Sequence, residues 1–216
     1  MRNSEKLKRT VLLAMLAALS YMIVTFVRIP VVLFLKYEPK DVIITIGGFL
    51  FGPMASFLVS LVVSLLEMVT ISDTGPIGCI MNLISTCSFA CTAALIYKKK
   101  HSLKGAVLGL LAGSVFMAAA MLLWNWLITP WYMNVPREEV QVLLIPMFLP
   151  FNLLKAGLNS ALVLVLYKPL VSALRKTKLV PAAPQTSRSA KPGIYLFAGI
   201  LLITCILLML VLQGKL

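Results

Sequence analysis

The sequence contains few charged residues. Only 12% of its 216 residues are Asp, Glu, Lys or Arg, whereas about 25% is usual in soluble domains. Hydrophobic residues make up 60% of the chain, and several apolar runs reach the roughly 18–20 residues that cross a bilayer as a helix. These features exclude an ordinary soluble domain and indicate a helical membrane protein with several spans. They also exclude a transmembrane β-barrel, whose strands of about 10 residues alternate in polarity.

Residues that commonly support catalysis or metal binding are also scarce. Histidine occurs once, as His101 after three lysines in a polar loop, which argues against histidine chemistry inside the membrane. The four cysteines form no CxxC pair and predict neither a metal site nor a disulfide framework. The sequence has no HExxH, GxSG or paired-aspartate motif. We therefore expect no catalytic residue, no bound metal and no cofactor of the chain's own.

Acidic residues are outnumbered by basic ones, which gives a net charge of +13. A surface that binds nucleic acid is one interpretation of this charge. Membrane topology is the interpretation we favour, because Lys and Arg gather in the cytoplasmic segments of membrane proteins and lie here between the apolar runs. We therefore expect membrane lipid around the chain and no nucleic-acid partner.

Apolar runs predict five single membrane-spanning helices, at 10–27, 77–97, 105–128, 145–167 and 194–212. The segment 42–71 is too long for one crossing and is interrupted by "FGP", where proline disfavours a continuous helix. If 42–71 crosses twice, the basic residues of the N-terminus, of 98–104 and of 168–193 all lie inside, as the positive-inside rule requires. We predict seven helices, with the N-terminus cytoplasmic and the C-terminus outside.

These segments divide the chain into three regions. Residues 1–175 form a membrane core of six helices. Residues 176–193 are rich in Pro, Ala and Ser and are expected to form a cytoplasmic linker. Residues 194–216 are expected to add one C-terminal transmembrane helix. The predicted fold class is therefore an all-α integral membrane protein with a six-helix bundle and one extra helix.

A polar stripe runs along the sixth predicted helix. Phe148, Asn152, Lys155 and Asn159 recur at spacings of four, three and four, so they lie within an arc of about 60° on the helix. A lysine at mid-bilayer depth costs about 2.5–3.5 kcal/mol. Such a stripe is expected to face the bundle interior or a wet cavity.

Other polar groups lie in the outer halves of neighbouring helices. Glu67 and Asn125 are each about 6–8 Å below the outer end of their helix, within reach of Lys155. These groups are expected to converge on one cavity that opens to the outside and binds a small molecule. An alternative is a purely structural role, with a Glu67–Lys155 ion pair and amide bonds between helices.

The first outer segment, Arg28 to Val42, is apolar and aromatic although it carries five charges. We expect it to fold over the cavity as a lid, with Leu35, Lys36 and Tyr37 directed downward; a loop resting on lipid headgroups is the alternative. The tryptophans cluster near the outer end of the fifth predicted helix and suggest an interfacial belt or, alternatively, a ligand pocket. They are Trp124, Trp126 and Trp131.

Several segments together resemble a known family. They are "FLKYEPKDV…GGFLFGP", "SLLEM", "WNW…TPWY" and "PFNLLKAGLN". In combination they resemble the riboflavin-binding S component of energy-coupling factor (ECF) vitamin transporters, the RibU family, over about residues 8–170. The resemblance implies a six-helix bundle in a bacterial cell membrane that captures the vitamin from outside beneath a lid.

The resemblance also implies partners and roles for individual residues. The S component would dock on an ECF transmembrane coupling subunit driven by two cytoplasmic ATPase subunits, which use the ATP, and Ala14 and Ala18 would form part of the docking face. Riboflavin, or alternatively FMN, would be the transported ligand. Asn152, Lys155 and Asn125 would bind the polar edge of the isoalloxazine ring, Glu67 the ribityl hydroxyls, and Tyr37 with Lys36 and Leu35 would cover the ring.

Other functions remain open at this point. An S component for a different vitamin would use the same cavity. An intramembrane enzyme would have to rely on Glu67 or Lys155 alone. A self-contained carrier is less compatible with the sequence, because no duplicated half is evident.

Overall fold

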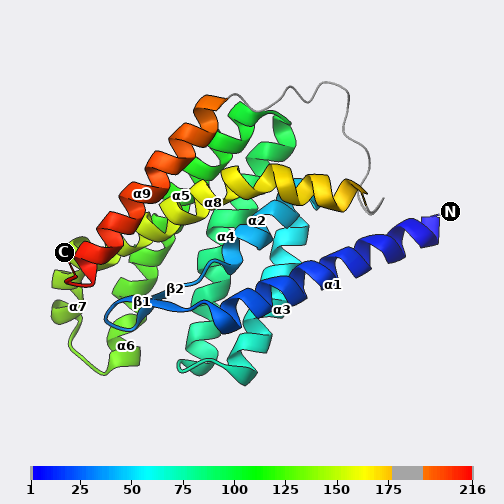
Figure 1. Ribbon diagram of the computed structural model, residues 1–216. Coiled ribbons are helices and arrows are strands. Elements are labelled where there is room, and N and C mark those ends of the chain that lie inside the picture. Colours follow the sequence, from blue (N-terminus) through cyan, green and yellow to red (C-terminus); the bar gives the residue numbers. More distant parts are fainter. Residues whose placement is uncertain (1, 177–191, 216) are drawn as a thin grey trace.

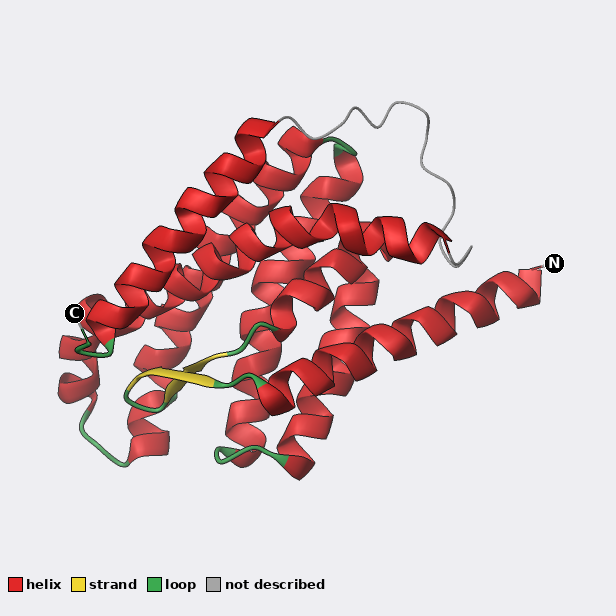
Figure 2. Cartoon of the chain, viewed as in Figure 1, coloured by secondary structure: helices red, strands yellow, loops and turns green. Residues whose placement is uncertain are grey.

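The protein is described by a computed structural model that covers residues 2–176 and 192–215 (Figure 1). The helices and strands follow in chain order: α1 (Arg2–Phe26), β1 (Ile29–Val32), β2 (Leu35–Tyr37), α2 (Lys40–Phe51), α3 (Pro53–Thr70), α4 (Gly75–Lys99), α5 (Leu103–Leu127), α6 (Thr129–Met133), α7 (Arg137–Leu143), the π-helical turn η1 (Leu144–Phe148), α8 (Leu149–Lys176) and α9 (Pro192–Leu212). Helices dominate, and the two strands form one short antiparallel hairpin (Figure 2).

Within the described residues, six helices are long and apolar enough to cross a membrane. They are Lys6–Phe26, Pro53–Thr70, Gly75–Lys99, Leu103–Leu127, Arg137–Ala173 and Tyr195–Leu212. The all-α membrane fold expected from the sequence is therefore confirmed. The remaining predicted helix, the second in chain order, is α2, whose 12 residues make it the short member of the pair predicted for 42–71. The predicted linker, 176–193, lies almost entirely outside the described residues.

The break predicted at "FGP" is a sharp reversal of the chain. Gly52 has a φ of +91°, in the region that glycine adopts most readily, and Pro53 begins α3. The Ser56 hydroxyl donates a hydrogen bond to the carbonyl of Ile44 at 3.1 Å, so α3 folds back along α2. This helical hairpin brings the beginning of α2 beside the end of α3.

Small residues allow the central helices to pack closely. A Cβ atom added at Gly109 of α5 would lie 2.6 Å from the carbonyl oxygen of Ala93, and one at Gly113 would lie 2.5 Å from that of Phe89. The backbones of α4 and α5 therefore touch, as small residues permit in membrane bundles, where there is little hydrophobic driving force between helices.

The hairpin formed by β1 and β2, residues 29–37, lies at one end of the molecule together with α6 and α7, at the end away from the N-terminus (Figure 1). Ile29 pairs with Tyr37 and Pro30 with Lys36. Leu35 and Tyr37 are buried, because alternate residues of β2 point toward the helices. The prediction that this apolar segment folds onto the bundle is confirmed.

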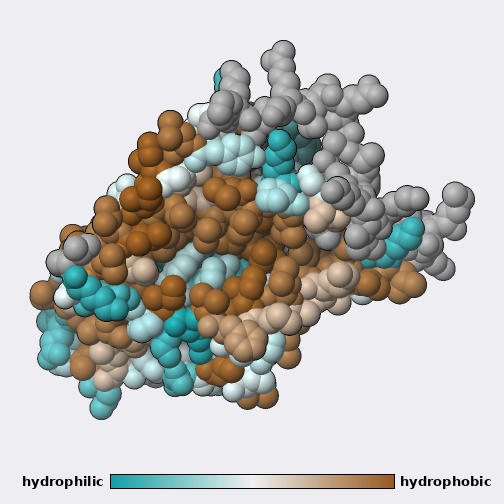
Figure 3. Space-filling model, in the orientation of Figure 1, coloured by the Kyte–Doolittle hydropathy of each residue, from teal (hydrophilic) through white to brown (hydrophobic). Residues whose placement is uncertain are grey.

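Helix α9 packs along α8, where it buries Ala198 and Cys205. The rest of its surface is strongly apolar and exposed, as at Leu196 and Ile203. Apolar side chains cover most of the face shown in Figure 3, including α9, and hydrophilic ones gather toward the end that holds the hairpin. A helix with this surface is suited to contact with lipid.

Candidate ligand-binding site

A cavity of about 200 Å³ lies between the hairpin and the helices. Its lining comes from β2, α4, α5, α6 and α8 and from loops beside the hairpin and before α4, and it combines charged, amide and apolar side chains. The lining residues are Arg28, Phe34, Leu35, Lys36, Glu38, Asp73, Thr74, Met81, Asn82, Ser85, Met121, Asn125, Tyr132, Phe151, Asn152 and Lys155. An apolar wall with a few placed polar groups is the usual composition of a small-molecule site.

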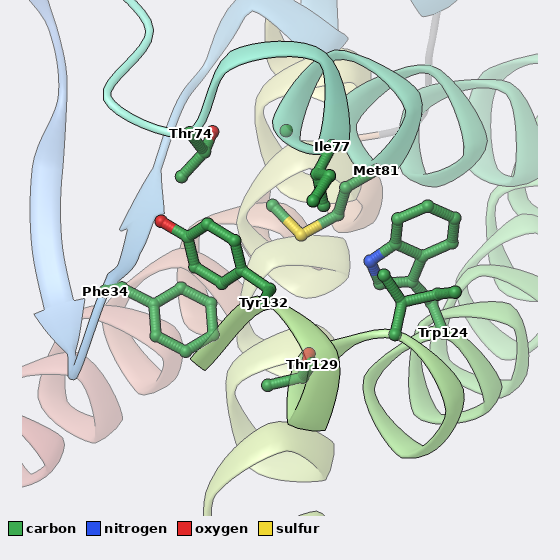
Figure 4. Close-up of a pocket in the computed structure, with 9 residues that line it drawn as sticks. Phe34, Thr74, Ile77, Met81, Trp124, Thr129 and Tyr132 are labelled. Carbon is green, nitrogen blue, oxygen red and sulfur yellow. The ribbon is translucent and has the colours of Figure 1, made fainter. Parts of the chain in front are cut away.

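A smaller hollow adjoins this cavity and shares Phe34, Thr74, Met81 and Tyr132 with it. Figure 4 shows the rings of Phe34 and Tyr132 close together, with the indole of Trp124 facing Met81 across the hollow. The centroids of the Phe34 and Tyr132 rings are 6.0 Å apart in an edge-to-face arrangement. The hollow therefore offers aromatic and thioether surface beside the polar cavity.

The tryptophans thus differ in their surroundings. Trp124 lines the small hollow, whereas Trp131 is 84% exposed. The guanidinium of Arg137 lies over the Trp126 ring, at 5.3 Å from the ring centroid, in a cation–π arrangement. Trp126 and Trp131 match the predicted interfacial belt, and Trp124 matches the alternative of a ligand pocket.

Lys155 reaches the cavity wall from α8, and its ammonium group has two partners there. Its Nζ lies 3.2 Å from Oδ2 of Asp41 and 3.4 Å from the Ser85 hydroxyl. The Thr86 hydroxyl donates to the other oxygen of Asp41 at 2.7 Å. Lys155 is therefore buried in an ion pair with the carboxylate of Asp41, which is itself fully buried. This pairing offsets the cost of placing an ammonium group in the membrane.

The alternative prediction of a Glu67–Lys155 ion pair is wrong. Glu67 instead pairs with Lys40, which donates to both of its carboxylate oxygens, and Oε2 of Glu67 also accepts a hydrogen bond from Asn82 at 3.0 Å. Lys40 is only 1% exposed. The α2–α3 hairpin causes this pairing, because it places the first turn of α2 beside the last turn of α3.

Lys40 and Asp41 were expected in an outer loop, and the structure places both in the buried first turn of α2. Neither lines the cavity, but both pair with predicted site residues, and the sequence interpretation missed this supporting role. It also did not predict the lining residues Met81, Asn82, Ser85 and Phe151. The available signal was the cluster of charges in "YEPKD" directly before an apolar run. Charged residues are almost never fully buried unless they are paired, so such a cluster beside a buried helix indicates ion pairs.

Two further ion pairs, both made by Glu38, join this group at the base of the hairpin. Glu38 lies 2.8 Å from Nζ of Lys40 and 2.9 Å from Nε of Arg28. Burial raises the pKa of Glu38, but the charges of Lys40, Lys155 and Arg28 outweigh burial and lower the pKa to about 2. Glu38 therefore stays ionised, and its contribution to stability is lost only as the pH falls from about 4.5 through about 2.

The hairpin is also tied to the loop between α3 and α4. Lys36 forms an ion pair with Asp73 at 2.7 Å, and the Arg28 guanidinium donates to the carbonyl of Ile71 at 2.7 Å. The hydrogen bond from Lys36 lowers the pKa of the exposed Asp73. Leu35 and Lys36 line the cavity, so these contacts hold the hairpin at the rim of the cavity, where the sequence predicted a lid.

The structure brings most of the predicted binding residues together. Asn152, Lys155, Asn125, Lys36 and Leu35 all line the cavity. The amide nitrogens of Asn125 and Asn152 donate to carbonyls one turn earlier in their own helices, at 2.7 Å each. Their orientation is therefore fixed before a ligand binds.

Two predicted residues lie behind the cavity and are not part of its lining. The Tyr37 hydroxyl donates to Oδ1 of Asn159 at 3.1 Å, and Glu67 is held by Lys40 and Asn82. Both side chains are buried. In this structure they support the residues that line the cavity, and direct contact between a ligand and either of them stays a prediction.

The predicted docking residues lie on the exposed face of α1. Ala14 and Ala18 are exposed, whereas Leu12 and Leu16 on the opposite side are buried in the bundle. A smooth exposed stripe of small residues permits close approach of another helix. Whether that helix belongs to a partner protein stays a prediction.

Comparison with known proteins agrees with this architecture. The family described as "ECF transporter, substrate-specific component" matches residues 8–167. The chain is 28% identical over 183 residues to the riboflavin transporter RibU of Staphylococcus aureus (strain TCH60), which covers 81% of this chain and 96% of that protein. It is 26% identical over 188 residues to the riboflavin transporter FmnP of Bacillus subtilis (strain 168), which covers 81% of this chain and 99% of that protein.

A solved structure gives the same result in three dimensions. It is reported as "Structure and mechanism of the S component of a bacterial ECF transporter", has a TM-score of 0.64 and is 29% identical to this chain. The match covers 79% of this chain and 99% of the solved one. The family match ends at residue 167, before α9 begins. From the bundle, the cavity and these matches together, the chain belongs to the family of substrate-specific components of ECF transporters.

Proposed function

We propose that the chain captures riboflavin from outside the cell, as the substrate-binding subunit of an ATP-driven ECF vitamin importer. The observation that carries the proposal is the convergence of Asn125, Asn152 and Lys155 on one cavity. The polar edge of an isoalloxazine ring mixes carbonyl acceptors with an N–H donor, and a lysine with two amides complements that mixture. The relatives described as riboflavin transporters support the choice of this vitamin.

The rest of the cavity suits the rest of the molecule. The aromatic and thioether side chains of Phe34, Tyr132 and Met81 offer a surface for the flat apolar part of the ring. The charged groups near the cavity pair with one another, Lys155 with Asp41 and Glu38 with Arg28. A site whose charges are internally paired is compatible with an uncharged ligand such as riboflavin.

The partners follow from the family. The chain would dock on a transmembrane coupling subunit through the face that carries Ala14 and Ala18, and two cytoplasmic ATPase subunits would supply the energy from ATP. Its N-terminus would lie in the cytoplasm and the hairpin end would face outward. The exposed positions of Ala14 and Ala18 support this docking face.

Binding is tested first with the detergent-purified chain. We expect a visible flavin band from co-purified ligand, or tight saturable quenching of riboflavin fluorescence on titration. A colourless protein that does not quench riboflavin would refute the choice of ligand, and a panel of other vitamins would then test the alternative of an S component with another substrate. Uptake by this chain alone in liposomes would instead support a self-contained carrier.

Docking is tested by the double substitution Ala14→Leu with Ala18→Leu. Two larger side chains should block close helix approach, so that riboflavin binding persists while ATP-dependent uptake is lost. Leu19→Ala, at another exposed position of α1, is the matched control and should leave both activities unchanged. Normal uptake by the double variant would refute this docking face.

A further inference from the structure

Asp41 is fully buried and lies outside the lining of the cavity. Its carboxylate nevertheless touches the residues around it through both oxygens. Oδ1 accepts from the Thr86 hydroxyl at 2.7 Å, and Oδ2 lies 3.3 Å from the Asn159 amide nitrogen and 3.2 Å from Nζ of Lys155. A carboxylate with this many partners has a fixed position.

Lys155 needs such a fixed partner. A lysine side chain is long and flexible and tends to extend toward water from a membrane position. Its other partner in the structure, the Ser85 hydroxyl, is more distant, at 3.4 Å. Asp41 is therefore the group that determines where the Lys155 ammonium sits on the cavity wall.

Three helices fix the position of the Asp41 carboxylate: its own helix and the two that carry its hydrogen-bond donors. Asp41 belongs to α2, Thr86 to α4 and Asn159 to α8. Asn159 in turn accepts a hydrogen bond from Tyr37 of the hairpin at 3.1 Å. Rigid elements thus hold Asp41, and buried polar networks of this kind orient functional groups when every member is satisfied.

We propose that Asp41 is a positioning residue: it holds the Lys155 ammonium toward the cavity and so sets the affinity for the flavin without touching it. This inference rests on the proposed function. An ammonium group held in its binding position before the ligand arrives loses less freedom on binding. Asp41 therefore acts on affinity only through Lys155.

The test is a double-mutant cycle on the full chain in detergent, with riboflavin as the probe. Dissociation constants and ligand-free thermal midpoints are measured for wild type, Asp41→Asn, Lys155→Met and the double variant. Asp41→Asn should raise the Kd about tenfold or more in the wild-type background, and by less than about twofold when Lys155 is already Met. Ser56→Ala, which removes a buried hydrogen bond elsewhere on α2, is the control and should lower the midpoint without changing the Kd.

Two results would overturn the inference. One is an Asp41→Asn protein that melts earlier but binds riboflavin with the wild-type Kd, which would make Asp41 purely structural. The other is an equal loss of affinity in both backgrounds, which would make its action independent of Lys155. If wild type itself fails to bind riboflavin, the proposed function fails first and the inference fails with it.

A second variant covers the case in which Asp41→Asn does not fold. Thr86→Val removes the hydroxyl that fixes Asp41 but leaves the ion pair itself in place. It should raise the Kd about threefold or more with Lys155 present and have no effect with Lys155→Met. An unchanged Kd in the folded Thr86→Val protein would overturn the inference.

Discussion

The two faces of α8 differ sharply in chemistry. The front face carries Asn152, Lys155 and Asn159, all buried and directed toward the cavity or its polar support. The back face carries Gly157, where an added Cβ would lie only 2.7 Å from Sγ of Cys205 in α9. One helix thus combines a polar surface on the side of the cavity with a small, apolar surface that contacts another helix.

The two faces also differ in their relation to the family: the front face lies within the matched residues, whereas the back face contacts α9, which lies beyond them. The front face belongs to residues 8–167, which match the family. The residues that line the cavity all precede α9. Helix α9 meets the back of α8 and shares a hydrophobic cluster with Val31, Leu35 and Tyr37 of the hairpin. Just after α9, the Gln213 amide donates to the carbonyl of Pro30 at 2.6 Å. We therefore expect front-face substitutions to change affinity and back-face substitutions to change packing.

Lys155→Met should have the largest effect on the front face. It removes the ammonium group from the cavity and leaves Asp41 as a buried carboxylate without its cation. Breaking a buried pair in this way costs about 3–5 kcal/mol of stability, and we expect the riboflavin Kd to rise at least about 100-fold. Fluorescence titration and thermal unfolding measure the two effects.

The control for this prediction is Leu153→Met, on an exposed part of the same helix. It should change neither the Kd nor the thermal midpoint. An unchanged Kd for a folded Lys155→Met protein would remove Lys155 from the site and undo the distinction between the two faces.

Asn152→Leu should have the next largest effect. The amide lines the cavity and is oriented by its bond to the carbonyl of Phe148. Its loss should remove the proposed polar contact with riboflavin, worth about 1–3 kcal/mol, so the Kd should rise about tenfold or more. Titration of the folded variant measures this. Wild-type affinity would show that the lysine alone carries recognition on this face.

Gly157→Leu tests the back face. The larger side chain cannot fit beside Cys205, and overpacking costs about 1–3 kcal/mol. The thermal midpoint should therefore fall while the Kd stays within about twofold. The matched control is Gly199→Leu in α9, because a Cβ at Gly199 meets no atom within 4 Å. A large loss of affinity in Gly157→Leu alone would mean that the two faces are coupled through α8.

Gln213→Ala should have the smallest effect. It removes the exposed hydrogen bond from the end of α9 to the hairpin while the apolar contacts between them remain, and such a bond contributes about 0.5–1.5 kcal/mol. We expect riboflavin to dissociate about two- to threefold faster, measured by stopped-flow fluorescence, because the hairpin is held less firmly. A tenfold change would instead make α9 an integral part of the lid.

The helices and the polar stripe can be predicted from the amino-acid sequence alone. Apolar runs of sufficient length predict spans, because the bilayer has a fixed thickness and backbone groups in lipid must bond internally. The spacing of Asn152, Lys155 and Asn159 predicts one buried face, because the helical repeat is fixed. Both predictions rest on local geometry, and the structure confirms both.

The pairing of the charged residues, in contrast, follows from the packing of the helices and could not be predicted from the sequence. From the sequence, Glu67 was as reasonable a partner for Lys155 as any acidic residue, and Lys40 and Asp41 read as parts of a loop. The reversal at Gly52 places Lys40 beside Glu67 and leaves Asp41 to face α4 and α8. Charge pairing depends on distances of a few ångströms between segments far apart in the chain, and these distances are set by how the helices pack.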